Sequence, residues 1–165
     1  MLAEGKVDSV TGFSFSSYLN LVRLGVPEDD ISTILMADHG LMLYGNAIIV
    51  NTDYAKSNPD LVKKFLVAVG AGWKDAINDP KAAAAALVKR NPAADAALEQ
   101  RRLQLAIDAN VLTDYVKSNG MGGIDSARFG AAIKQLSETY DYKATPDPSL
   151  YFTDAYLPSS GISLD

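Results

Sequence analysis

The chain contains no cysteine and only one histidine, which excludes several classes of catalytic and metal-binding site. Without cysteine there can be no disulfide, cysteine nucleophile, thiolate zinc site or iron–sulfur cluster. Any Ser-His-Asp arrangement would have to use His39, because histidine supplies most general-base chemistry near neutral pH. No second catalytic signal accompanies His39, so we interpret it as a loop or cleft histidine without a proton-transfer role.

The chain also has fewer positively than negatively charged side chains. The 165 residues carry a formal net charge of -5 and give a pI near 4.8. Binding that neutralises phosphates or anionic lipid needs Lys and Arg, so nucleic acid and membrane surfaces are poor partners. The longest apolar runs, such as residues 41–50, are much shorter than the roughly 20 residues of a bilayer span.

The first residues lack the basic start, apolar middle and small-residue cleavage site of a signal peptide. From this we expect either a cytoplasmic chain or one whose true N-terminus is missing. With 48% hydrophobic and 21% charged residues, the chain has the balance of one globular domain.

Three local patterns resemble functional motifs but lack a decisive residue. The run Gly12–Ser16 starts like a nucleophile elbow, yet Ser16 stands where that motif has its last glycine. Asp29 and Asp30 are typical of a solvated turn rather than a metal site. The glycines of residues 120–123 lack the lysine of a phosphate-binding loop. The sequence therefore predicts no catalytic residue, no metal and no cofactor.

Short apolar runs predict strands near the beginning of the chain. They lie at residues 7–12, 31–36 and 47–50, where β-branched residues are bounded by turn formers. A strand as early as residues 7–12 needs neighbours from elsewhere.

Helical signals dominate the rest. Ser14 or Ser16 can cap a helix that Gly25 ends, and Asn58-Pro59 begins a helix through Ile77 with Trp73 on its apolar face. Further starts are predicted at Asp79-Pro80, at Asn91-Pro92 and at Asp125. The tail from residue 143 has three prolines and should contain no long helix.

A polar aromatic and an amide, Tyr44 and Asn46, flank Gly45 where a loop enters the predicted strand at 47–50. Ligands in open α/β sheets bind at strand ends, where polar groups converge. The alternative is that Tyr44 is a core residue and Asn46 a turn residue. The sequence leaves both interpretations open.

The order of several stretches resembles the solute-binding proteins of ABC importers for nitrate, sulfonate, taurine and thiamine-pyrimidine precursors. The matching stretches are residues 5–12 (GKVDSVTG), 37–46 (ADHGLMLYGN), 58–62 (NPDLV), 71–76 (AGWKDA) and 152–158 (FTDAYLP). The resemblance covers nearly the whole chain, but the family's first lobe would lie upstream of Met1.

This resemblance implies an α/β fold, namely the helix-rich C-terminal half of a type II periplasmic-binding-protein-like fold. Residues 1–12 would be the end strand of the second lobe and the hinge approach. Residues 13–142 would be the C-terminal part of the first lobe, and 143–165 a proline-containing tail.

The resemblance also implies a function: reversible binding of a small organic solute, such as a pyrimidine precursor or a sulfonate, between two lobes. Its ligand-binding residues would be Thr11, Gly12, Phe13 and Ser14 at the hinge, with Asp38, Tyr44 and Asn46 in the following loop. An ABC transporter permease would be the partner, and the location periplasmic or at the extracellular surface.

The chain is expected not to be an enzyme. One alternative is a pyrimidine-precursor-synthase-like enzyme domain, whose relatives depend on a cysteine-rich segment that is missing here. The other is a non-catalytic interaction domain. Because the first lobe is missing, self-association is also expected.

Overall fold

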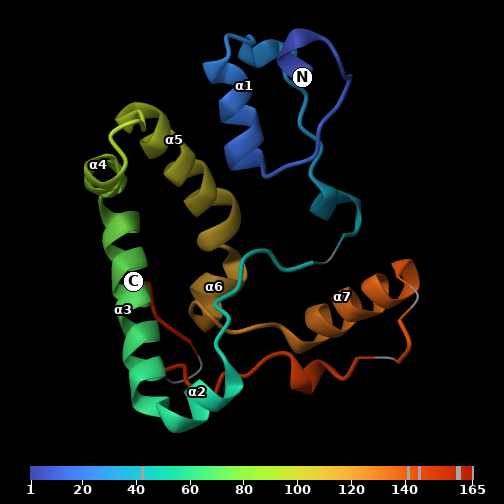
Figure 1. Cartoon of the computed structure of the whole chain (residues 1–165), viewed down its shortest axis with the longest axis vertical. Helices are drawn as coiled ribbons and strands as arrows, with labels where there is room; N and C mark the ends of the chain where they lie inside the picture. Colours follow the sequence, from blue (N-terminus) through green and yellow to red (C-terminus); the bar gives the residue numbers. More distant parts are fainter. Residues whose placement is uncertain (42, 141, 145, 159–160, 165) are drawn as a thin grey trace. The chain divides into compact units, whose positions relative to one another are not determined.

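The computed structural model describes residues 1–41, 43–140, 142–144, 146–158 and 161–164. These residues form helices joined by loops (Figure 1). The α-helices are α1 (Leu19–Arg23), α2 (Thr52–Ser57), α3 (Pro59–Asn78), α4 (Pro80–Arg90), α5 (Ala96–Ala106), α6 (Asp114–Asn119) and α7 (Ser126–Thr139). Short 3₁₀ or π turns are η1 (Leu2–Glu4), η2 (Ser14–Tyr18), η3 (Glu28–Asp30), η4 (Met36–His39), η5 (Ile107–Val111) and η6 (Pro148–Leu150).

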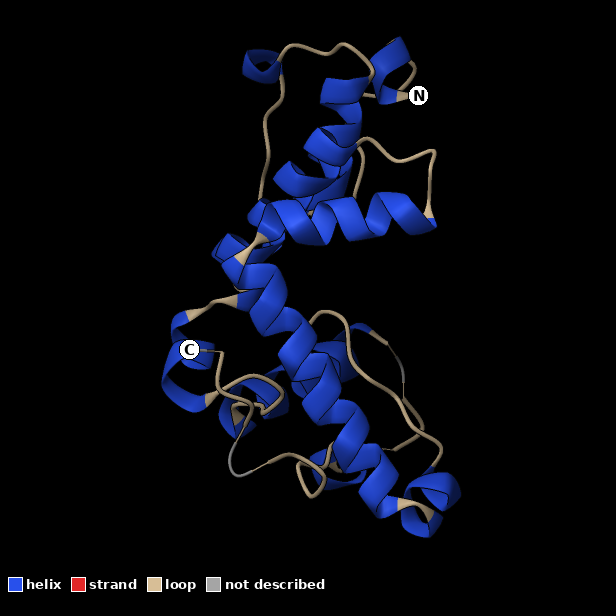
Figure 2. Cartoon of the chain, turned by 90° about the vertical axis from the view of Figure 1, so that its left-hand side faces the viewer, coloured by secondary structure: helices blue, strands red, loops and turns tan. Residues whose placement is uncertain are grey.

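The strands predicted at residues 7–12, 31–36 and 47–50 do not form. Within the described residues, Figure 2 shows helices and loops only, and the single β-contact is an isolated bridge between Met121 and Ile162. The apolar, β-branched composition of these runs indicates side chains that pack well in a sheet. A strand forms only where a neighbouring strand pairs with its backbone hydrogen-bonding groups, so composition alone is not sufficient. The chain is therefore helix-rich as predicted, whereas the strands of the predicted α/β fold are absent from the described part.

Helix starts follow the predicted caps where an acceptor side chain stands at the right place. Asp79 accepts a hydrogen bond from the amide of Ala82 at 2.9 Å, and Asp125 accepts one from the amide of Arg128 at 2.7 Å. The start predicted at Asn91-Pro92 was wrong. Asp95 caps α5 instead, because its carboxylate accepts from the amide of Leu98 at 2.7 Å, while Asn91 ends α4.

The helix predicted from Asn58-Pro59 is confirmed as α3, the longest described element. Val62 and Gly70 are buried, and Trp73 is half-buried on the same apolar stripe. The chain divides into two compact units, and the division falls within α3 between Lys74 and Asp75.

Unit 1 consists of residues 1–35 and 75–113. Its α5 packs against α4 and η2, and its most deeply buried side chains are Leu19 and Ile107. Gly25 ends α1 with a φ of 87°, a left-handed conformation that glycine adopts without steric cost. The helix predicted to end at Gly25 is confirmed, with a π turn as its first part.

Unit 2 consists of residues 36–74 and 114–165. Its buried apolar residues are Ala55, Val62, Ala132 and Leu164. The C-terminal segment contains only the short η6, as predicted, although residues 145, 159, 160 and 165 of that tail lie outside the described part. The assignment of residues 1–12, 13–142 and 143–165 to lobes and tail stays a prediction.

Close backbone contacts hold the C-terminal segment within unit 2. The amide of Met121 donates to the carbonyl of Ile162 at 2.8 Å, and the amide of Ile162 donates back at 2.9 Å. A β-carbon on Gly161 would lie 2.6 Å from the carbonyl oxygen of Asn119, so only glycine allows this approach. A β-carbon on Gly70 of α3 would overlap the side chain of Ile162.

Candidate functional site

The proposed hinge residues Thr11 to Ser14 lie in unit 1, where an extended stretch enters the π turn η2. Thr11, Gly12 and Phe13 are exposed, and Ser14 is half-buried as the first residue of η2. The ring of Phe13 stacks on that of Phe15, with 5.2 Å between centroids. A wide π turn is a feature often found at functional sites, because it redirects backbone groups that a regular helix would satisfy.

Arg102 of α5 anchors this turn. Its Nη1 donates to the carbonyl oxygens of Phe15 at 3.1 Å and Ser16 at 3.3 Å, and its Nη2 donates to Oδ1 of Asn20 at 3.3 Å. Glu99 orients the guanidinium by accepting from Nε at 3.0 Å. Both charged side chains are largely covered, since each is 21% exposed. Carbonyls of η2 are thus satisfied by a residue more than 80 positions away in sequence.

A second charged cluster fastens η3 to α5 in unit 1. Arg101 makes two parallel hydrogen bonds to Glu28, Nη1 to Oε1 at 2.8 Å and Nη2 to Oε2 at 2.6 Å. The hydroxyl of Tyr18 donates to the same carboxylate, and Arg101 lies 5.7 Å from the centre of the Tyr18 ring. The hydrogen bonds from Arg101, followed by the one from Tyr18, lower the pKa of Glu28 from 4.5 to about 2.

This lowered pKa predicts acid sensitivity. The stabilisation from the ionised Glu28 is fully present above about pH 4.5 and is lost as the pH falls through about 2, because the folded state releases the proton more readily than the unfolded state. Glu28→Gln should therefore be less stable than the parent protein at pH 7, and the difference should shrink between pH 4.5 and 2. Urea unfolding across this range measures it, with Asp29→Asn in the same turn as the charge-matched control. A difference that stays constant with pH contradicts the prediction.

Tyr44 lies in unit 2 and contacts the beginning of α7. Its hydroxyl accepts a hydrogen bond from the amide of Asp125 at 2.8 Å, and the guanidinium of Arg128 lies 4.4 Å from its ring centre. Arg128 also donates to the carbonyl oxygen of Leu43 at 3.0 Å, and the ring of Phe129 meets Tyr44 edge-on at 6.2 Å. Tyr44 is still 36% exposed, so part of its side chain remains open to solvent.

Asn46 and Asp38 are the remaining proposed ligand residues, and both are exposed in unit 2. Asp38 lies on the 3₁₀ turn η4, and Asn46 lies two residues beyond Tyr44 in the same loop. The structure thus brings Tyr44 and Asn46 together in one loop and places Thr11 to Ser14 together in another. The two groups belong to different units.

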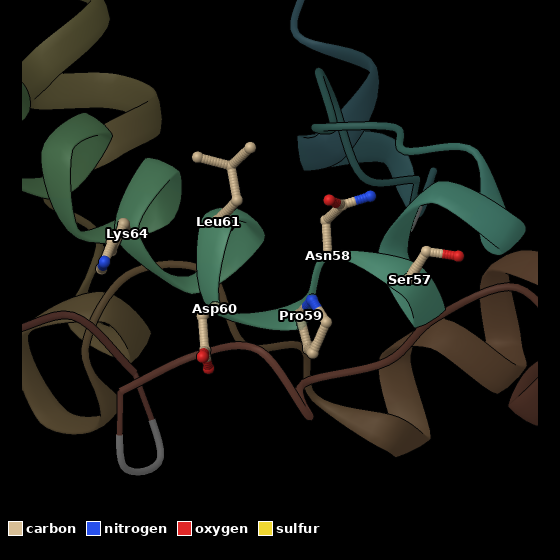
Figure 3. Close-up of a pocket in the computed structure, with 6 residues that line it drawn as sticks. All are labelled: Ser57, Asn58, Pro59, Asp60, Leu61 and Lys64. Carbon is tan, nitrogen blue, oxygen red and sulfur yellow. The ribbon is translucent and has the colours of Figure 1, made fainter.

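A shallow pocket lies at the corner between α2 and α3, where Asn58 and Pro59 join them (Figure 3). Ser57, Asp60, Leu61 and Lys64 complete its lining. In Figure 3 Asn58 and Leu61 point to one side of the corner and Pro59 and Asp60 to the other. Ligand sites need polar groups that converge in an enclosed space, so this corner does not make one.

Within the part of the chain that the structure describes, no three His, Asp or Glu side chains are grouped as metal ligands. In the same residues, no helix has the combined length and apolarity of a transmembrane span.

Comparison with protein families decides where the chain belongs. The sequence profile described as NMT1/THI5 like matches residues 1–83, just over half of the 165 residues. The chain belongs to the NMT1/THI5-like family. This membership confirms the family predicted from the sequence motifs, while the extension of the resemblance beyond residue 83 and its assignment to the C-terminal half stay predictions. No curated protein and no solved structure shows significant similarity to the chain.

All the proposed ligand residues of this NMT1/THI5-like chain, from Thr11 to Asn46, lie inside the matched region. The anchoring residues Glu99, Arg102 and Arg128 lie beyond it. Sequence reasoning missed Arg102 and Arg128 because the backbone carbonyls that they bind are 80 or more positions away. Only the spacing of Glu99 and Arg102, three residues apart on one helix, gave a local hint of an ion pair.

Proposed function

We propose that this NMT1/THI5-like chain is the solute-binding component of an ABC importer, or a fragment of one. It would bind a small organic solute reversibly, such as a pyrimidine precursor or a sulfonate. The family match over residues 1–83 carries this proposal, because the family indicates a solute-binding or related role and the match includes every proposed ligand residue. The finer assignment, to the C-terminal half of a type II periplasmic-binding-protein-like fold, is part of the same proposal.

The chemistry of the proposed ligand residues suits such a solute. Thr11, Ser14 and Asn46 offer neutral donors and acceptors, Asp38 adds an acceptor for an amino group, and Phe13 and Tyr44 offer ring faces. Neutral hydrogen bonds and stacking give reversible binding without covalent chemistry. A permease would be the partner, and the periplasm or the extracellular surface the location, as is typical of the family.

The synthase-like alternative is less well supported. By resemblance, those enzymes depend on a cysteine-rich segment, and this chain has no cysteine. The family as a whole leans towards binding rather than catalysis. We therefore place the chain among the binding proteins.

Calorimetric titration of the full chain tests this function. Taurine serves as the sulfonate probe and an aminopyrimidine carrying a hydroxymethyl group as the pyrimidine probe. We expect one probe to bind, and Asn46→Ala to weaken its binding about tenfold while changing the free energy of unfolding by less than about 0.5 kcal/mol.

Asn110→Ala, at an exposed asparagine of η5, is the matched control and should leave binding unchanged. Failure of both probes to bind would contradict the function. Binding that survives Asn46→Ala unchanged would contradict the site alone.

A further inference from the structure

Asn119 is the only asparagine of the chain that a glycine follows. At such a pair the backbone nitrogen of the glycine can attack the side-chain amide carbon of the asparagine, because glycine has no β-carbon to hinder the approach. The new C–N bond closes a five-membered succinimide ring, and the side-chain nitrogen leaves as ammonia. Water then opens the ring and leaves either an aspartate or an isoaspartate. The sequence therefore indicates a site of spontaneous covalent modification at Asn119.

The folded structure holds both reacting groups of this pair in other hydrogen bonds. Asn119 is the last residue of α6, and its Nδ2 donates to the carbonyl oxygen of Tyr115 at 3.0 Å. The backbone nitrogen of Gly120, which is the nucleophile, donates to the carbonyl oxygen of Val116 at 2.8 Å. Ring closure requires this N–H to lose its proton and turn towards the Asn119 side chain. Both hydrogen bonds must therefore break before the reaction starts.

The C-terminal segment packs on the same pair and leaves its main chain no room to rotate. A β-carbon on Gly120 would lie 2.9 Å from the carbonyl carbon of Gly161, and one on Gly161 would lie 2.6 Å from the carbonyl oxygen of Asn119. Met121 and Ile162 exchange two backbone hydrogen bonds beside this contact. Gly120 also has a φ of 79°, so the fold itself requires the glycine that makes the pair reactive.

We propose that Asn119 is a deamidation site and that the C-terminal segment controls its reaction. While Gly161 packs on Gly120, the pair is held closed. When the segment detaches, the last turn of α6 opens and the succinimide forms. Local openings of this kind cost less free energy than global unfolding, so the reaction can proceed from the native protein. The proposal is independent of the proposed solute binding, because the two share no residue.

Either product makes the detachment harder to reverse. Isoaspartate carries the main chain through its β-carbon and so adds one backbone atom between residues 119 and 120. The contact with Gly161 has no space for an added atom. Aspartate keeps the backbone length, but its carboxylate has no N–H to donate to Tyr115 and adds a negative charge to a chain of net charge -5. Modification at this site should therefore weaken the attachment of the C-terminal segment.

Ageing of the full chain at mildly alkaline pH, followed by peptide mapping with mass spectrometry, measures the reaction at each asparagine. Gly161→Ala should speed the conversion of Asn119 about tenfold or more in buffer, because the added β-carbon overpacks the contact and favours the open state. Gly130→Ala on α7 is the matched control and should leave the rate unchanged, since no heavy atom lies within 4 Å of its β-carbon. Asn119→Gln should abolish the reaction at this position, because glutamine would have to close a larger ring.

The same measurement in enough urea to unfold the chain separates the site from its control. There the parent protein and Gly161→Ala should convert at equal rates, and Asn119 should convert before every other asparagine. Another asparagine that converts first in urea overturns the site. Equal rates for the parent protein and Gly161→Ala in buffer overturn the control by the C-terminal segment.

Ile162→Ala is the second variant and covers the case in which Gly161→Ala does not fold, as judged by circular dichroism. It removes the side chain that packs on Gly70 and keeps the backbone of the C-terminal segment intact. It should raise the rate at Asn119 in buffer as well. A parent protein that converts as fast in buffer as in urea shows that the fold gives no protection and overturns the proposal.

Discussion

Gly70→Leu is expected to destabilise the protein by about 3 kcal/mol, which is at the upper end for an overpacked site. A β-carbon at this position would overlap Cγ2 of Ile162 and lie 3.0 Å from its Cδ1. The Ile162 side chain cannot swing away easily, because a β-branched residue has few rotamers. Leucine would therefore push the C-terminal segment off α3 and break its two hydrogen bonds with Met121.

Gly72→Leu on the same helix is the matched control. No heavy atom lies within 4 Å of a β-carbon at Gly72, so the replacement should stabilise α3 by about 0.5–1 kcal/mol through helix propensity. Urea unfolding followed by the fluorescence of Trp73, the only tryptophan, measures both variants. Combining Gly70→Leu with Ile162→Ala should recover part of the loss. Equal effects at positions 70 and 72 would show that the contact with Ile162 is not formed.

Arg102→Ala is expected to cost about 2–4 kcal/mol, because it leaves Glu99 and the carbonyls of η2 partly buried without their donor. Arg102→Lys should recover only part of the lost stability, since an ammonium lacks the planar set of donors with which the guanidinium binds several acceptors at once. Hydrogen exchange should quicken in η2 and α1. Chemical denaturation and hydrogen exchange on the full chain measure the two effects.

Arg90→Ala, at an exposed arginine that ends α4, is the control and should change stability by less than about 0.5 kcal/mol. If Arg102→Lys behaves like the parent protein, the charge alone matters and the anchoring geometry does not. If Arg102→Ala leaves exchange in η2 unchanged, another group holds that turn.

The features predicted correctly from sequence are those whose cause is local. A cap needs a side chain two or three residues from the amide it accepts from, and Asp79 and Asp125 satisfy that condition within their own segments. The error at Asn91 has the same origin, because Asp95 is a second acceptor four residues later. The Asn91-Pro92 pattern suggested a start there, and the sequence analysis did not recognise Asp95 as the competing cap.

Features that depend on distant contacts were not predictable in this way. Ile162 packs against Gly70, and Arg102 donates a hydrogen bond to the carbonyl of Phe15. Both contacts join residues more than 80 positions apart, so no periodic pattern in the sequence predicts them. The runs at 7–12, 31–36 and 47–50 failed for a related reason. Their composition describes a preference for neighbours, and the described part of the chain supplies none. The proposed ligand residues come from family resemblance, so their roles stay predictions.

The sequence around the exposed residues 45–50 also determines which proteases and labelling reagents can react there. Between Arg23 and Lys56 there is no lysine or arginine, so trypsin and amine-directed labels find no target in that stretch. Yet the stretch includes Ile34 and Ile49, two of the most exposed apolar side chains. Limited digestion with trypsin would therefore make the region look protected, whereas a protease that cuts after large apolar residues should cleave there first.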